Sequence, residues 1–326
     1  MRIGRQIAAV GIAALCIYVL AAAGVWTELE NRAVGGISGL LARPAAAVAS
    51  VAETEPAPSA AQKASPSPST GPSAAEKAIP TTISGGLKIK NETKYAVDAS
   101  ALLKAGPSIK LAAGKPQILI IHTHSSEAYT PAGLDRYDTA DSNRTEDKRY
   151  SVIRVGDELA ARLTEAGLDV IHDRNIYDYP SYTGSYSRSG EAVQKYLKQY
   201  PTIKIVIDLH RDAIGAGDAV YKTVAEEKGV CASQVMLLTG TDESGLKNPG
   251  WRENLKLALY LQNAVGQKHP TLMRPVEIVP QRYNLHLTTG SLILEVGSSG
   301  NTLQEALAGV RLFADGAAPA LRALVK

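Results

Sequence analysis

The chain has 326 residues, of which 45% are hydrophobic, and its formal net charge is only +3. So small a net charge gives no sign of a nucleic-acid partner. The length is sufficient for a sizeable hydrophobic core. The two cysteines, Cys16 and Cys231, lie far apart, and Cys16 stands inside an apolar run, which excludes a disulfide within the remainder of the chain. Because Cys231 precedes the apolar run VMLLTG, we expect a buried, inert thiol.

Residues 7–26 carry no charge and are almost entirely apolar. Twenty helical residues rising about 1.5 Å each span a hydrocarbon core of about 30 Å. Two arginines precede the run and two glutamates follow it, which predicts a single transmembrane anchor with residues 1–6 in the cytoplasm and the rest of the chain outside. The alternative is a cleaved signal peptide with a cleavage site near Ala21–Ala23.

Residues 27–80 are rich in Ala, Pro and Ser and contain few large apolar side chains. Such a segment buries too little surface to offset its ordering entropy, so we expect a disordered linker. Residues 81–114 are either more linker or the first edge of a domain. We expect the folded domain over residues 115–326.

From residue 115 onward, strand and helix patterns alternate. Apolar runs predict strands at 117–121, 168–172, 203–210, 233–240 and 291–296. Helical spacing predicts helices at 152–163, 191–200 and 254–265, and a capping box from Thr302 to Glu305 opens a last helix. This alternation predicts a single α/β domain with a largely parallel central sheet flanked by helices.

Polar side chains that bind metals follow three of these strands. His124 and Glu127 come just after the first strand, His210 ends another, and Glu295 lies near the end of the last. Ligands of parallel sheets gather at the carboxyl ends of the strands, and zinc binds imidazole nitrogen and carboxylate oxygen while leaving one position for water. We therefore predict that His124, Glu127 and His210 hold Zn²⁺ and that Glu295 is the general base. The competing interpretation is a set of structurally satisfied histidines, with Glu295 paired to a core arginine.

Several neighbours leave alternatives open. His122 is either the metal ligand in place of His124 or a residue that orients a ligand. Asp147 or Glu146 is the alternative carboxylate ligand. Arg211 is predicted to bind a substrate carboxylate or the oxyanion, and Asp212 to hydrogen-bond an imidazole. For each of them the alternative is a structural ion pair.

A cluster of tyrosines fills the segment YDYPSYTGSYSRSG: Tyr177, Tyr179, Tyr182 and Tyr186. These phenols either stack on a sugar or peptide substrate or belong to an ordinary packed loop. The remaining histidines, His172, His269 and His286, have no such context, although His286 is close enough to the last strand to line a cleft.

Five motifs together resemble a known family. HTHSSEAY, VIRVGDELAARL, DLHRDA, RYN and LEVGSSGNTLQEA, over roughly residues 115–315, resemble stage II sporulation protein P of endospore-forming Firmicutes. That family is similar to zinc N-acetylmuramoyl-L-alanine amidases, which share a fold with zinc carboxypeptidases. The resemblance implies that His124, Glu127 and His210 hold zinc and that Glu295 is the general base. The chain lacks the Gly-His-Gly-Gly form of the first amidase motif.

The resemblance also implies a function. It implies cleavage of the amide bond between N-acetylmuramic acid and L-alanine, with a further cut in cross-linked stem peptides. The setting would be the septal peptidoglycan during forespore engulfment, at the membrane and beside stage II sporulation proteins D and M. Two alternatives remain: a zinc peptidase that acts on stem peptides only, and a non-catalytic wall-binding scaffold.

Overall fold

The computed structural model describes residues 81–84, 87–132, 143–216 and 219–326. The predicted anchor at 7–26 and linker at 27–80 lie outside these residues. Within the described ranges, no helix combines the length and the apolar character needed to cross a membrane.

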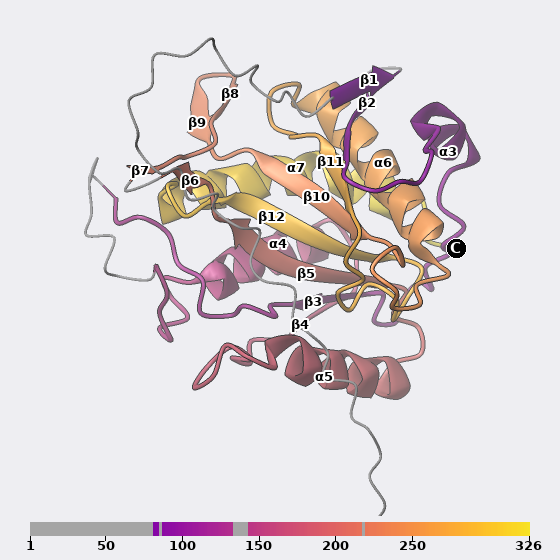
Figure 1. Cartoon of the computed structure of the whole chain (residues 1–326), viewed down its shortest axis with the longest axis horizontal. Helices are drawn as coiled ribbons and strands as arrows, with labels where there is room; N and C mark the ends of the chain where they lie inside the picture. The colour runs from indigo at the N-terminus through magenta and orange to yellow at the C-terminus, as the bar shows by residue number, and fades with distance from the viewer. Residues whose placement is uncertain (1–80, 85–86, 133–142, 217–218) are drawn as a thin grey trace, which may run out of the picture. The chain divides into compact units, whose positions relative to one another are not determined.

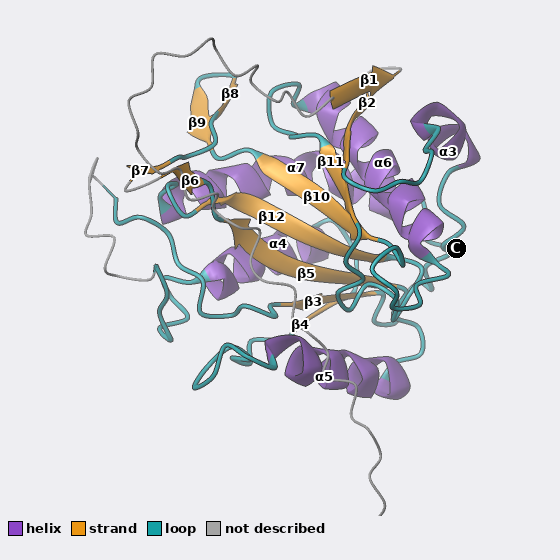
Figure 2. Ribbon diagram, in the orientation of Figure 1, coloured by secondary structure: helices purple, strands orange, loops and turns teal. Residues whose placement is uncertain are grey.

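An eight-stranded sheet forms the centre of the fold, in the order β1-β2-β11-β10-β12-β5-β3-β4 (Figures 1 and 2). Its strands are β1 (Thr81–Ser84), β2 (Leu87–Asn91), β3 (Ile118–Ile121), β4 (Val170–His172), β5 (Ile205–Asp212), β10 (Val235–Gly240), β11 (Val276–Val279) and β12 (Ser291–Ser298). Neighbouring strands are parallel except in the pairs β1–β2 and β10–β12. The predicted α/β fold with a largely parallel sheet is therefore confirmed.

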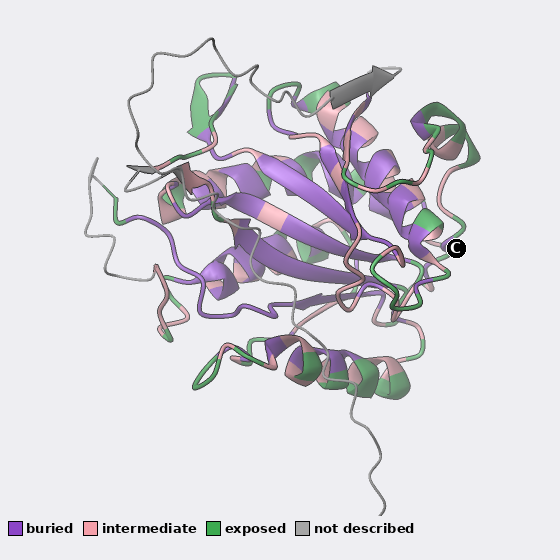
Figure 3. Cartoon of the chain, viewed as in Figure 1, coloured by how far each residue is buried: buried purple, intermediate pink, exposed green. Residues whose placement is uncertain are grey.

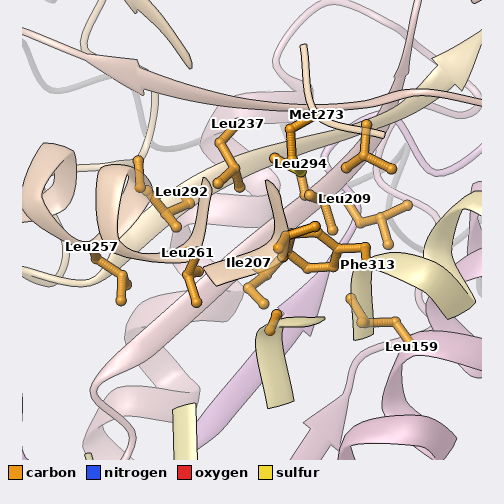
Figure 4. Packing of buried hydrophobic residues seen from close by; sticks show 14 of the residues in the cluster. Leu159, Ile207, Leu209, Leu237, Leu257, Leu261, Met273, Leu292, Leu294 and Phe313 are labelled. Carbon is orange, nitrogen blue, oxygen red and sulfur yellow. The ribbon is translucent and has the colours of Figure 1, made fainter. Parts of the chain in front are cut away.

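Helices cover both faces of this sheet. They are α3 (Ala99–Ala105), α4 (Val152–Glu165), α5 (Ser185–Gln199), α6 (Trp251–Lys268) and α7 (Leu303–Arg322). The larger core lies between one sheet face and α4, α6 and α7, where Phe313 packs among leucines of several elements (Figure 4). A smaller core joins α5, through Val193, to Leu119 and Ile121 on the opposite face.

The alternation of side chains along β5 and β12 decides what this second face carries. Leu209 and Leu294 point into the larger core, so their neighbours His210 and Glu295 point to the opposite face. The two strands are adjacent and parallel, with Glu295 directly opposite His210 in the register. Glu295 is partly exposed, and Figure 3 shows this break in the otherwise buried strand β12.

Some boundaries and elements differ from the sequence-based expectations. Residues 81–114 are not simply a linker, because β2 pairs with β11 and α3 packs against α6. Helix α5 begins at Ser185, earlier than the predicted residue 191. Strand β11 was not predicted, since it has only four residues between Pro275 and Pro280.

The expectation for Cys231 was wrong. It lies exposed on β9 (Val230–Ala232), which forms a small hairpin with β8 (Ala225–Glu227). A second short hairpin joins β6 (Gly215–Ala216) and β7 (Ala219–Val220). The apolar run after Cys231 belongs to the next strand, β10, so its burial does not extend back to the thiol.

Candidate metal centre

His124, Glu127 and His210 are all buried, and one ligand atom from each lies within 4.8 Å of the others. The Nδ1 atom of His124 is 3.5 Å from Oε1 of Glu127, and Nδ1 of His210 is 3.4 Å from Oε2. Donors placed about 2.1 Å from a tetrahedral zinc ion stand about 3.4 Å apart. The Nε2 atom of His124 is buried without a hydrogen-bond partner among the described residues. The donor types therefore fit a zinc ion, and the three residues lie close enough to share one, with each histidine on a different oxygen of Glu127.

The motif HTHSSE forms a turn whose Thr and Ser side chains hold the two ligands. The amide and hydroxyl of Thr123 donate to Asp208 over 2.8 and 2.6 Å. The amide and hydroxyl of Ser126 donate to Asp178 over 3.0 and 2.6 Å. The Thr123 bonds hold the chain after β3 against β5, and the Ser126 bonds hold it against the segment between β4 and α5. Together they place His124 and Glu127 beside His210.

Asp208 is the carboxylate that supports His210. Its Oδ1 atom lies 2.9 Å from Nε2 of His210, while the other ring nitrogen faces Glu127. Burial would raise the pKa of Asp208, but His210 and Thr123 hold that pKa below its ordinary value. Asp212 contacts no imidazole among the described residues; it pairs with Arg274 over 2.7 Å, which is the structural ion pair given as its alternative. Asp208 therefore lies beside Nε2 of His210, and Nδ1 is the ring nitrogen that faces Glu127 and the candidate metal position.

The carboxylate of Glu127 stays ionised inside the protein. Burial alone would raise the pKa of Glu127, but hydrogen bonds from His124 and His210 and the charge of Arg211 hold it well below its usual range. The backbone N–H of Arg211 also donates to Oε2 over 3.2 Å. A fixed, charged oxygen ligand is thus present before any metal binds.

Glu295 combines proximity to this group with an unusual protonation behaviour. Its Oε2 atom is buried and has no hydrogen-bond partner among the described residues. Burial raises the pKa of Glu295 to about 8, with His210 opposing the shift and the negative charges of Asp212 and Glu127 adding to it. A perturbed carboxyl beside candidate metal ligands is typical of an acid–base residue.

We expect Asp208→Asn to weaken zinc binding about 10- to 100-fold, because the variant no longer supports the imidazole of His210 with a charged acceptor. Zinc affinity is measured by competition with a chelating dye. Asp212→Asn is the matched control on the same face of β5 and should change the affinity much less. Equal effects in the two variants would refute the assignment of Asp208.

His122 points away from the candidate metal group. Its Nδ1 atom lies 2.8 Å from the carbonyl oxygen of Leu209, and its Nε2 atom lies 2.8 Å from Nε2 of His172. Burial lowers the pKa of His122 to about 3, so the ring is neutral. The structure therefore does not bring His122, the alternative ligand, to the candidate metal group. The residue instead ties β3 to β5 and β4, and His172 has a context that the sequence did not reveal.

The His122–His172 pair needs a glycine on α4. A Cβ atom added to Gly156 would lie 2.6 Å from Nε2 of both His122 and His172. We expect Gly156→Ala to reduce the free energy of unfolding by about 1–3 kcal/mol, as overpacking of a buried site does. Urea unfolding measures this change. Gly266→Ala on α6, where a Cβ meets nothing within 4 Å, should stabilise instead, and a stable Gly156→Ala protein would contradict the packing described here.

Other predicted site residues lie elsewhere. Asp147 pairs with exposed Arg149 over 2.6 Å, and Glu146 is exposed, so the alternatives to Glu127 as carboxylate ligand are not brought to the group. The guanidinium of Arg211 donates to the carbonyl oxygens of Ala128 and Asn143 over 2.8 and 3.0 Å. These contacts hold the loop in place, and a role of Arg211 toward an oxyanion stays a prediction.

Two further residues border the group. The ring of Tyr182 stacks on His124 with centroids 4.7 Å apart, and the guanidinium of Arg144 lies 4.9 Å from the centre of the Tyr182 ring. Arg144 also pairs with Asp178, and its Nη2 atom is 3.7 Å from Oε1 of Glu127. The tyrosine cluster was a visible signal, whereas Arg144 lies in a segment without periodicity and was missed.

The fold and this group define an α/β protein with a buried two-histidine, one-glutamate centre on one face of its sheet. The chain belongs to the Stage II sporulation protein P family, whose family model matches residues 41–318. It is 27% identical over 212 residues to Stage II sporulation protein P of Bacillus subtilis, covering 62% of this chain and 50% of that protein. The chain thus spans about half the length of this curated relative.

Solved structures that are similar to this chain include two amidases. The N-acetylmuramoyl-L-alanine amidase AmiC2 of Nostoc punctiforme matches with a TM-score of 0.38 and 17% identity, over 65% of this chain and 98% of that one. The catalytic domain of CwlV, an N-acetylmuramoyl-L-alanine amidase from Bacillus (Paenibacillus) polymyxa, matches with a TM-score of 0.37 and 11% identity, over 64% and 97%.

Proposed function

We propose that this protein is a zinc-dependent peptidoglycan hydrolase that cleaves the amide bond between N-acetylmuramic acid and L-alanine. The observation that carries the proposal is the buried His124–Glu127–His210 group with Glu295 opposite His210 on the adjacent strand. Membership of the sporulation family supports a role in degrading the septal wall during engulfment.

The donor set assigns each residue a task in the reaction. His124, Glu127 and His210 would hold the zinc ion, which when bound polarises the scissile carbonyl and lowers the pKa of water. Glu295 accepts the proton that water loses on attacking the carbonyl carbon, and it passes that proton to the departing nitrogen of L-alanine. The C–N bond breaks as the nitrogen gains the proton, which leaves a free muramic acid carboxylate and a stem with a new amino terminus.

The surroundings of Glu295 suit this proton transfer. A carboxyl whose pKa of about 8 lies near the operating pH can both accept a proton and release it, which an ordinary glutamate does less readily. The helices α4, α6 and α7 cover the other face of the sheet, so they do not cover Glu295. Substrate can therefore approach this carboxyl from the partly exposed side of β12.

We further propose the cellular setting from the sequence and the family. Residues 7–26 would anchor the chain in the cell membrane and residues 27–80 would tether the hydrolase domain in the septal space. Stage II sporulation proteins D and M are the proposed partners. Each of these points depends on the family resemblance and on the predicted anchor.

A stem-peptide zinc peptidase is the second candidate, and one observation favours it. Such an enzyme needs a cation for the terminal carboxylate of a peptide, and Arg144 lies at the edge of the group with its side chain 28% exposed. In this case the same ligands and Glu295 would act on a bond within the stem.

Mass spectrometry of purified peptidoglycan digested with the full chain and zinc distinguishes these functions. We expect glycan strands freed of peptide and stems with new L-alanine amino termini. Shortened stems on intact muramic acid would replace the amidase with the peptidase. A folded, zinc-loaded protein that binds the wall and releases nothing would support the non-catalytic scaffold and refute the proposal.

A further inference from the structure

Tyr283, in the motif RYN, has an unusual backbone conformation. Its φ angle is +49°, and among the described residues only two other non-glycine residues, Asn143 and Lys228, have positive values. A bulky residue in this region is strained and persists only where the surrounding structure holds it. The observed outlier therefore points to a functional constraint on the position of the Tyr283 side chain.

The next residue holds the strained turn against α5. The side-chain amide of Asn284 donates to the carbonyl oxygen of Tyr186 over 2.8 Å and to the hydroxyl of Ser189 over 3.1 Å. A Cβ atom on Gly190 would lie 2.9 Å from Oδ1 of Asn284, so the contact is already close. The RYN turn is thus fixed to the same helix that covers the β3 and β5 side of the sheet.

These two hydrogen bonds of Asn284, the Asn284 clamp, place Tyr283 in a row of aromatic rings beside the candidate metal group. This row, the aromatic wall, consists of Tyr283, Tyr186 and His124. The ring centre of Tyr283 is 5.2 Å from that of Tyr186, whose ring in turn packs edge-to-face with that of His124, with the two centroids 5.4 Å apart. Burial raises the pKa of Tyr283, and the negative charge of Glu295 adds to that shift. The phenol is therefore a neutral O–H donor at every working pH.

The hydroxyl of Tyr283 is also uncommitted. Within the described residues it makes no hydrogen bond, whereas the hydroxyls of Tyr129 and Tyr260 donate to the backbone carbonyls of Val296 and Ala320. Arg211, predicted from the sequence to steady an oxyanion, uses its guanidinium on the loop carbonyls of Ala128 and Asn143. The hydroxyl of Tyr283 is therefore a candidate oxyanion donor beside Arg211, whose guanidinium is already engaged with the loop.

We propose that the hydroxyl of Tyr283 contacts the substrate and donates a hydrogen bond to the carbonyl oxygen of the scissile bond as negative charge develops there. This role rests on the proposed hydrolase function. The hydrogen bond strengthens in the transition state, because a rigid, partly desolvated donor stabilises an oxyanion more than it stabilises a neutral carbonyl. The strained turn and the Asn284 clamp keep that donor in place before substrate binds.

Tyr283→Phe in the full chain tests the proposal with an N-acetylmuramoyl peptide as substrate. Loss of one oxyanion donor should lower kcat about 100-fold, with KM, zinc content and the midpoint of thermal unfolding close to those of the wild type. Tyr260→Phe, which removes a hydroxyl from α6, is the control and should leave kcat unchanged. A loss of zinc in Tyr283→Phe would instead indicate a structural role and overturn the proposal.

Asn284→Ala adds a second, independent arm. In the wild-type background, Asn284→Ala should lower kcat because the Tyr283 hydroxyl is held less firmly. In the Tyr283→Phe background, where that hydroxyl is already absent, the same substitution should lower kcat little further. Additive losses in the double variant, or a large loss in Tyr186→Phe with full activity in Tyr283→Phe, would overturn the assignment. A wild-type chain that cleaves no amide bond refutes the proposed function and this role together. Wild-type cleavage with an unimpaired Tyr283→Phe variant refutes this role alone.

Discussion

Glu295→Gln is expected to lower kcat about 1,000-fold while making the metal-free protein more stable at pH 8. The loss of activity would follow from removal of the group that we propose moves the proton between water and the leaving amine. Zinc content should be unchanged, because Glu295 lies opposite His210 without being one of the three grouped ligands.

The gain in stability follows from the raised pKa of Glu295, about 8 in the folded protein against 4.5 ordinarily. Between these values the folded state keeps a proton that the unfolded state has released, so wild-type stability falls as the pH rises from 4.5 to 8. Glutamine does not ionise. The difference in unfolding free energy should therefore appear above pH 4.5, grow to pH 8 and then stay level, at a size on the order of a few kcal/mol.

Urea unfolding at pH 5 and pH 8, with a chelator present, measures this difference alongside the kinetics. Glu277→Gln is the control, since Glu277 lies on a nearby strand and pairs with Lys90, and it should keep nearly full activity. An active Glu295→Gln enzyme would remove Glu295 from the reaction. Equal stability of variant and wild type at pH 8 would contradict the raised pKa of Glu295, whose Oε2 atom is buried without a partner among the described residues.

Glu127→Gln is expected to abolish both tight zinc binding and activity. The variant keeps an oxygen near the Arg211 N–H but loses the negative charge that the surrounding bonds hold in place. The drop in zinc affinity should exceed the roughly 10- to 100-fold loss that removal of a supporting partner causes. Dye competition measures the affinity, and peptide release from the wall measures the activity.

Exposed Glu226 on β8 offers a matched substitution for this test. Glu226→Gln should bind zinc and cleave as the wild type does. Retention of wild-type zinc affinity in Glu127→Gln would show that the carboxylate is not a ligand, and it would leave the two histidines without the third donor on which the proposal depends.

The metal group was predictable because its signals are local. An apolar strand followed by HTHSSE, and alternation along β5 and β12, are enough to bring His210 and Glu295 to one face. Period-two alternation cannot choose between Asp208 and Asp212, which share the face of His210. Thr123 reaches Asp208, whereas Arg274, from another part of the chain, takes Asp212, and only the folded structure shows these partners.

The same limit explains the other departures. His122 lies where the chain leaves β3, and its direction is set by His172 on β4, 50 residues later. The strands β10, β11 and β2 run opposite to β12, and this reversal and the pairing of β2 with β11 depend on long-range contacts that leave no periodic signal. The aromatic wall likewise joins Tyr283 to α5, two segments that are far apart in the sequence.

Zinc K-edge X-ray absorption on the full chain tests the central claim most directly. The structure predicts one zinc ion per chain with nitrogen and oxygen donors only, at about 2.0–2.2 Å, and the scattering pattern of two imidazole rings. A chain that binds no stoichiometric zinc, or a spectrum with a sulfur donor at about 2.3 Å from exposed Cys231, would contradict a centre built from His124, Glu127 and His210.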